Sequence, residues 1–132
     1  MFVALILFSL YISFKDARDH RISNRVLLIT FLSLLLLSVV TQRDTHPITG
    51  LSVLILAPLI LRIRIGAGNI KLLTVLGFFF IPLTWDMASE FFLSFTLICA
   101  TLLIIALVRS QSFAGSIALA PAICGAVIWC AR

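Results

Sequence analysis

The stretch FFLSFTLICATLLIIALV, residues 91–108, decides the class of fold. It contains no charged residue, and its length approaches the roughly 20 residues that a helix needs to cross a bilayer core. Leu, Ile, Val and Phe follow one another without the strict alternation that marks a membrane-barrel strand. The stretch therefore predicts a transmembrane helix, and the rest of the chain is interpreted against a bilayer.

Charged and turn residues divide the 132-residue chain into six apolar runs. The runs cover approximately residues 1–14, 26–40, 48–61, 72–85, 91–108 and 112–131. The first four are shorter than a spanning helix, so we expect flanking residues to extend them. Lys15, Arg25, Arg62 and Lys71 would then direct their charged ends to the water. The predicted fold class is all-α: a polytopic membrane protein with six transmembrane helices, in which residues 1–132 form one integral-membrane domain.

The composition excludes several classes of function. Hydrophobic residues make up 62% of the chain and charged residues 11%, against about 45–50% and 25% in a soluble domain. Too few charges remain for a soluble enzyme, a nucleic-acid-binding domain or a disordered tail. Cys99, Cys124 and Cys130 lack metal-site spacing. His20 follows Asp16 by four residues, but an interfacial histidine among charges is commoner than a metal ligand. We therefore predict no metal and no cofactor.

The basic residues predict how the runs are oriented. Eight of the ten lie in the first, third and fifth loops between runs: Lys15, Arg18, Arg21, Arg25, Arg62, Arg64, Lys71 and Arg109. Arg43 and Arg132 lie on the opposite side. The positive-inside rule places the three basic loops in the cytoplasm and both chain termini outside it.

Most polar side chains belong to two of these loops, KDARDHRISNR at residues 15–25 and RIGAGNIKL at residues 64–72. Because both loops face the cytoplasm, we expect them to converge. Asp16 directly follows an apolar run, where a carboxylate meets the negative end of a helix dipole. That unfavourable placement suggests a functional role. A solvated loop charge paired with Arg18 or Arg21 is the structural alternative.

The second loop is predicted to form a turn at the start of a helix. Gly66 and Gly68 allow unusual backbone angles or a close approach, and Asn69 before Ile70 is predicted to be the N-cap. A capping turn without further function is the structural alternative. The Gly-x-Gly pair completes neither the dinucleotide-binding fingerprint nor the P-loop.

Together the two loops resemble a known family. Asp16-x5-Ile22-Ser23-Asn24 is similar to the D-x5-I-P-N signature of type IV prepilin peptidases. GAGNIKL, residues 66–72, is similar to their G-x-G-D-x-K-L motif, which also defines the wider group of intramembrane aspartic proteases. SIALAP, residues 116–121, resembles the proline-containing final helix of the same family. The short chain, without a zinc-binding or methylase region, is similar to minimal members that serve Flp/tight-adherence or archaeal-type pilin systems.

The resemblance implies an aspartic endopeptidase that removes the leader peptide of type IV or Flp prepilins. It would act at the cytoplasmic face of a bacterial or archaeal membrane, with a prepilin and membrane lipids as partners and no nucleic acid. By this resemblance, Asp16 occupies the position of the first catalytic aspartate and Asn69 the position of the second. Further residues that would shape the substrate site are Gly66, Gly68, Lys71 and Asn24. The resemblance leaves the oligomeric state open.

Asn69 departs from the family pattern in a way that bears on activity. An amide has nearly the shape of a protonated carboxyl group but cannot act as a general acid or base. We therefore expect this chain to fold and bind substrate but to be inactive as written, whether the asparagine is engineered or natural. Ser23, in place of the usual proline, is a milder departure that affects loop stiffness.

Two functions stay open at this point. One is a prepilin endopeptidase in an inactive form, and the other is a non-catalytic prepilin-binding or pilus-assembly factor on the same fold. A small transporter or channel subunit is less favoured, because no ionisable residue lies in the middle of a predicted span.

Overall fold

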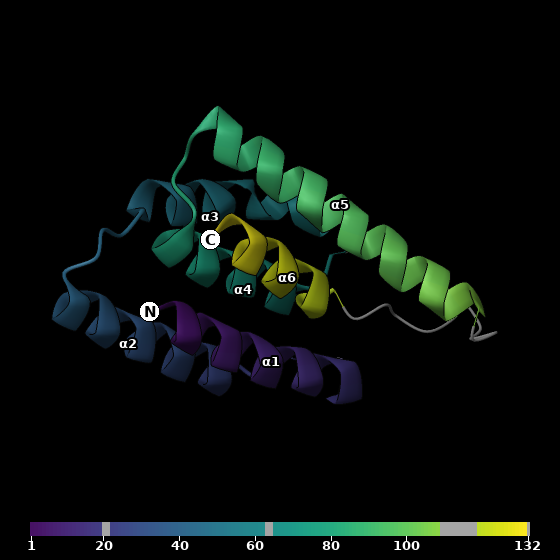
Figure 1. Cartoon of the computed structure of the whole chain (residues 1–132), viewed down its shortest axis with the longest axis horizontal. Coiled ribbons are helices and arrows are strands. Elements are labelled where there is room, and N and C mark those ends of the chain that lie inside the picture. Colours follow the sequence, from purple (N-terminus) through teal and green to yellow (C-terminus); the bar gives the residue numbers. More distant parts are fainter. Residues whose placement is uncertain (20–21, 63–64, 109–118, 132) are drawn as a thin grey trace.

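The computed structural model describes residues 1–19, 22–62, 65–108 and 119–131, which form six α-helices and no strand. The helices are α1 (Phe2–Asp19), α2 (Asn24–Thr41), α3 (Pro47–Arg62), α4 (Ala67–Phe80), α5 (Trp85–Val108) and α6 (Ala120–Cys130). Successive helices reverse direction, so the N and C termini lie at the same end of the bundle (Figure 1). The predicted all-α class is confirmed.

The core of the bundle forms around α6. This helix packs against α1, α4 and α5, while α3 and α2 pack against α4. Buried side chains come from each of the central helices, for example Leu5 of α1, Leu72 and Phe79 of α4 and Val127 of α6. A helix that is apolar on all sides is expected at the centre of a bundle, and α6 contains no charged residue.

Close contacts fix α4 against α2 and α3. The Gly50 backbone of α3 approaches α4 so closely that a Cβ there would lie 3.1 Å from the Cβ of Phe78. The His46 N–H donates to the Phe78 carbonyl at 2.6 Å, which joins the start of α3 to the end of α4. The ring of Phe31, from α2, packs against Phe78 and Phe79 with centroid distances of 5.7 and 5.5 Å. Small residues and aromatic contacts therefore hold these helices in register.

Only two of the described helices, α2 and α5, are long and apolar enough to cross a membrane on their own. The other apolar helices α3, α4 and α6 have 16, 14 and 11 residues. At 1.5 Å per residue, 14 residues extend about 21 Å, against a hydrocarbon core of about 30 Å. The expectation of six helices is therefore met, but helix length does not establish six membrane spans.

The helix bounds also differ from the predicted runs. The fourth helix ends at Phe80 instead of continuing to residue 85, because proline disfavours helical geometry in the residue before it, and Ile81, before Pro82, is extended with φ −116° and ψ 105°. The first helix continues five residues beyond its predicted end, through the charged residues up to Asp19. Residues 112–118 of the last predicted run lie outside the described residues, and α6 begins at Ala120.

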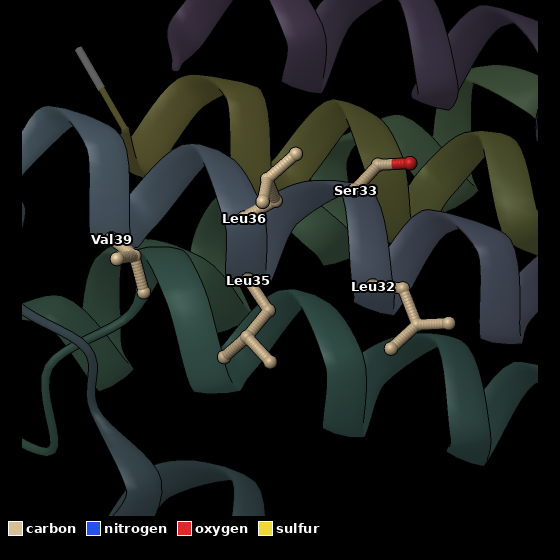
Figure 2. A pocket seen from close by; sticks show the side chains of 5 residues that line it. All are labelled: Leu32, Ser33, Leu35, Leu36 and Val39. Atoms are coloured by element: carbon tan, nitrogen blue, oxygen red, sulfur yellow. The ribbon is translucent and has the colours of Figure 1, made fainter.

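Large apolar surfaces face outward. Figure 2 shows a pocket on the outer face of α2, lined by Leu32, Ser33, Leu35, Leu36 and Val39. The side chains of Leu36 and Val39 are 70% and 71% exposed. Soluble monomers rarely present wide apolar patches of this kind. These faces, together with the two apolar helices, indicate a protein that lies in a membrane.

Candidate functional site

Both sequence motifs lie at one end of the bundle, opposite the chain termini (Figure 1). We call it the motif end, and it consists of the last turns of α1 and α3 and the first turns of α2, α4 and α6. Asp16 comes from the last turn of α1, and Asn24 is the first residue of α2. Gly68, Asn69 and Lys71 belong to the first turns of α4. The up-and-down order of the helices is what gathers these residues.

Asp16 is buried, with only 5% of its surface exposed. It lies within α1, whereas the sequence predicted that it follows the helix, because the helix continues through the charged residues. A carboxylate in the last turn still faces the negative end of the dipole, which typically costs about 0.3–1 kcal/mol. Burial of a charge adds to that cost unless a donor satisfies it. The predicted alternative of a solvated loop charge is therefore wrong.

The donor comes from α6. The backbone N–H of Ala120 donates to Oδ2 of Asp16 at 3.1 Å. The first N–H groups of a helix have no partner within the helix and form its positive end. The carboxylate therefore meets the favourable end of α6 as well as the unfavourable end of its own helix. Sequence reasoning missed this partner because an alanine 104 residues away offers only a backbone N–H, which no motif marks.

Asn69 is the third residue of α4 and does not cap it, so that prediction is wrong. The N-cap is Gly66, with φ −61° and ψ 140°, and its carbonyl accepts the Asn69 N–H at 2.9 Å. The helix begins earlier than predicted because Ala67 and Gly68 already adopt helical geometry. Oδ1 of Asn69 is buried and has no hydrogen-bond partner among the described residues. The second motif thus contributes a polar atom that the described part of the fold leaves unsatisfied.

Among the described residues, two contacts join the first motif to the second. A Cβ at Gly68 would lie 3.3 Å from the Cβ of Ile22, so the glycine lets α4 approach the segment that precedes α2. Nζ of Lys71 donates to Oδ1 of Asn24 at 3.0 Å. Neither glycine of the motif has a positive φ. Close approach, and not an unusual backbone angle, is therefore the property that Gly68 supplies.

Ser23 adopts the backbone conformation that its family counterpart would require. It is the N-cap of α2, with φ −68° and ψ 134°, and its side chain makes no capping hydrogen bond. Proline fixes φ near −65°. A serine here therefore keeps the backbone path that proline would set, and the difference from proline is a less rigid backbone at this position.

The motif end is strongly basic. Arg18, Arg25, Arg62 and Lys71 are exposed there. No group of three His, Cys, Asp or Glu side chains within the described ranges is placed to hold a metal ion. His20, which could have completed such a group, lies outside the described residues. The site is accordingly one of carboxylate, amide and backbone groups set in positive charge.

Comparison with known proteins supplies one match. A family model described as the type IV leader peptidase family matches residues 3–130. No curated protein matches the chain, and no solved structure does. The matched range includes both motif segments and the start of α6.

Proposed function

We propose, because the chain belongs to the type IV leader peptidase family, that it is an intramembrane aspartic endopeptidase of the prepilin-processing type whose second catalytic position carries Asn69. The observation that carries the proposal is the meeting of the two motifs at one end of the bundle. Gly68 packs closely against Ile22, and Lys71 donates a hydrogen bond to Asn24. Both contacts lie at the same end of the bundle as the buried Asp16. The substrate class is the prepilin, cut between its leader and its hydrophobic helix.

The proposed chemistry needs two carboxyl groups that share one proton, because adjacent carboxylates do not both ionise cheaply. One carboxylate takes a proton from the attacking water, and the hydroxide adds to the scissile carbonyl carbon. The other, protonated carboxyl group donates to the carbonyl oxygen. On collapse of the intermediate, the leaving amine receives a proton from the first group, and the second group takes back the proton that it gave to the carbonyl oxygen. Asp16 supplies one carboxyl group, and Asn69 stands where the second would act.

An amide at position 69 can donate a hydrogen bond to a carbonyl oxygen, but it cannot transfer and regain a proton. The chain as written should therefore bind prepilin and cleave it barely or not at all. General acid–base catalysis contributes about 10²–10⁴-fold to the rate of a reaction. The losses in rate from removing each member of a concerted pair do not simply add.

The test is leader cleavage by purified protein in detergent or liposomes with a matched prepilin, followed on a gel. Asn69→Asp should cleave, the chain as written should cleave at least about 10²-fold more slowly, and Asp16→Asn on the Asn69→Asp background should abolish cleavage again. Full activity with Asn69 intact would contradict the two-aspartate assignment.

A non-catalytic prepilin-binding or pilus-assembly factor is the second candidate. Asn69 itself favours it, because the side chain is neutral at a position where the chemistry needs an acid. The same assay separates the two functions. An Asn69→Asp protein that retains prepilin but does not cut it would support the binding factor.

We further propose that all six helices cross the membrane, with the motif end cytoplasmic and both termini outside. The basic residues at the motif end and the shared end of the two termini support this orientation. Ser23→Cys and Thr45→Cys, each in a background in which the three native cysteines are replaced by alanine, should label from opposite sides. An impermeant maleimide added to intact cells should reach position 45 alone. Labelling of both positions from outside would overturn the topology.

A further inference from the structure

The first backbone N–H groups of α6 all have hydrogen-bond partners only when Asp16 is counted among them. Among its first four residues, Pro121 has no N–H, and the N–H groups of Ala122 and Ile123 donate to the carbonyl of Leu119 at 3.1 Å each. The remaining N–H, that of Ala120, donates to Asp16. Leu119, the N-cap, has no side chain that can accept a hydrogen bond. Asp16 therefore serves as the missing cap of α6 although it belongs to α1.

The contact also restricts the carboxylate. An aspartate side chain turns about two bonds, and a hydrogen bond from a helix end fixes it with respect to a second, independently packed element. The residues that follow Ala120 on α6, such as Ala122, Ile123 and Cys124, are themselves buried. The donor is thus attached to a buried part of the fold, and it engages one of the two carboxylate oxygens, Oδ2.

We infer that Ala120, through its backbone N–H, is a positioning residue for the catalytic carboxylate: α6 holds Oδ2 of Asp16 so that Oδ1 is presented to the attacking water. This inference rests on the proposed function, because it assigns a role within that reaction. Ala120 touches neither substrate nor reacting atoms in this arrangement and acts only through Asp16. Catalysis depends on such positioning because a misplacement of about 1 Å can cost roughly 10²-fold in rate.

The test uses the full chain carrying Asn69→Asp. Ala120→Pro removes the N–H at the first helical position. Proline also disfavours the αR geometry that Leu119 adopts before it (φ −86°, ψ −22°), so this variant is interpreted together with the exchange measurement that follows. Ala120→Gly is the matched control, since it loosens the same position and keeps the N–H. We expect Ala120→Pro to lower kcat by about 10–100-fold with KM within about twofold, and Ala120→Gly to stay within about threefold on both. Equal losses in the two variants, or a loss confined to KM, would overturn the inference.

A second measurement does not depend on cleavage or on a foldable proline variant. Hydrogen–deuterium exchange of the peptide that covers the start of α6 is compared between the chain as written and its Asp16→Ala variant. Exchange at Ala120 should accelerate by at least about tenfold, while α3 and α4 keep their protection. Unchanged exchange at Ala120 would overturn the positioning role, whether or not the Asn69→Asp protein cleaves. Failure of cleavage with accelerated exchange would instead count against the proposed function alone.

Discussion

Asp16 and Asn69 occupy corresponding places in the two motifs, but the fold treats them differently. Asp16 is buried and accepts a hydrogen bond from α6. Asn69 holds a buried oxygen that no described group satisfies. The first side chain completes a helix end and so contributes to the fold as well as to the proposed chemistry. The second leaves the described packing with an unsatisfied acceptor, so its identity is not explained by stability.

The sharpest test of this contrast is the stability of two alanine variants. Asp16→Ala leaves the Ala120 N–H without its partner, and an unsatisfied buried group costs about 1–3 kcal/mol. Asn69→Ala removes an acceptor that is already unsatisfied, so it should change the free energy of unfolding by less than about 0.5 kcal/mol or raise it. Denaturant unfolding in one detergent, followed by circular dichroism, gives both values. Equal destabilisation by the two variants would remove the distinction between the sites.

The same two residues show what sequence patterns could and could not predict. The apolar runs predicted the helices, because burial and bilayer contact both favour long stretches of Leu, Ile and Phe. The motifs predicted which polar residues share one end of the bundle. The partner of Asp16 was not predictable, because any residue except proline supplies a backbone N–H and only the fold selects Ala120. The predicted start of α4 is wrong because Asn69 is a good capping residue, whereas Gly66, three residues earlier, caps the helix without a side chain.

The two glycines of the second motif extend the comparison, because the same substitution should act differently at each. A serine at Gly68 places its Cβ 3.3 Å from the Cβ of Ile22, which is backbone-anchored and cannot swing away. Such overpacking costs about 1–3 kcal/mol, partly offset by the better helix propensity of serine. A serine at Gly66 has open space, with the nearest atom Nδ2 of Asn69 at 3.9 Å, and it can cap α4.

We therefore expect Gly68→Ser to lower the free energy of unfolding by about 1 kcal/mol and Gly66→Ser to raise it by a few tenths. Denaturant midpoints in the same detergent measure both. A Gly68→Ser protein as stable as Gly66→Ser would mean that the segment around Ile22 does not press on α4, and the two motifs would then lose one of their two contacts.

The smallest expected effect concerns the other contact, from Lys71 to Asn24. Both side chains are exposed, so water competes for each partner, and the coupling should be about 0.5 kcal/mol. A double-mutant cycle with Lys71→Met and Asn24→Ala isolates it from the separate effects of each change on its own helix. The matched control pairs Lys71→Met with Thr41→Ala, at the far end of α2, where the two effects should add. Coupling in the control as large as in the Asn24 cycle would show that Lys71 acts on α2 as a whole and not through this hydrogen bond.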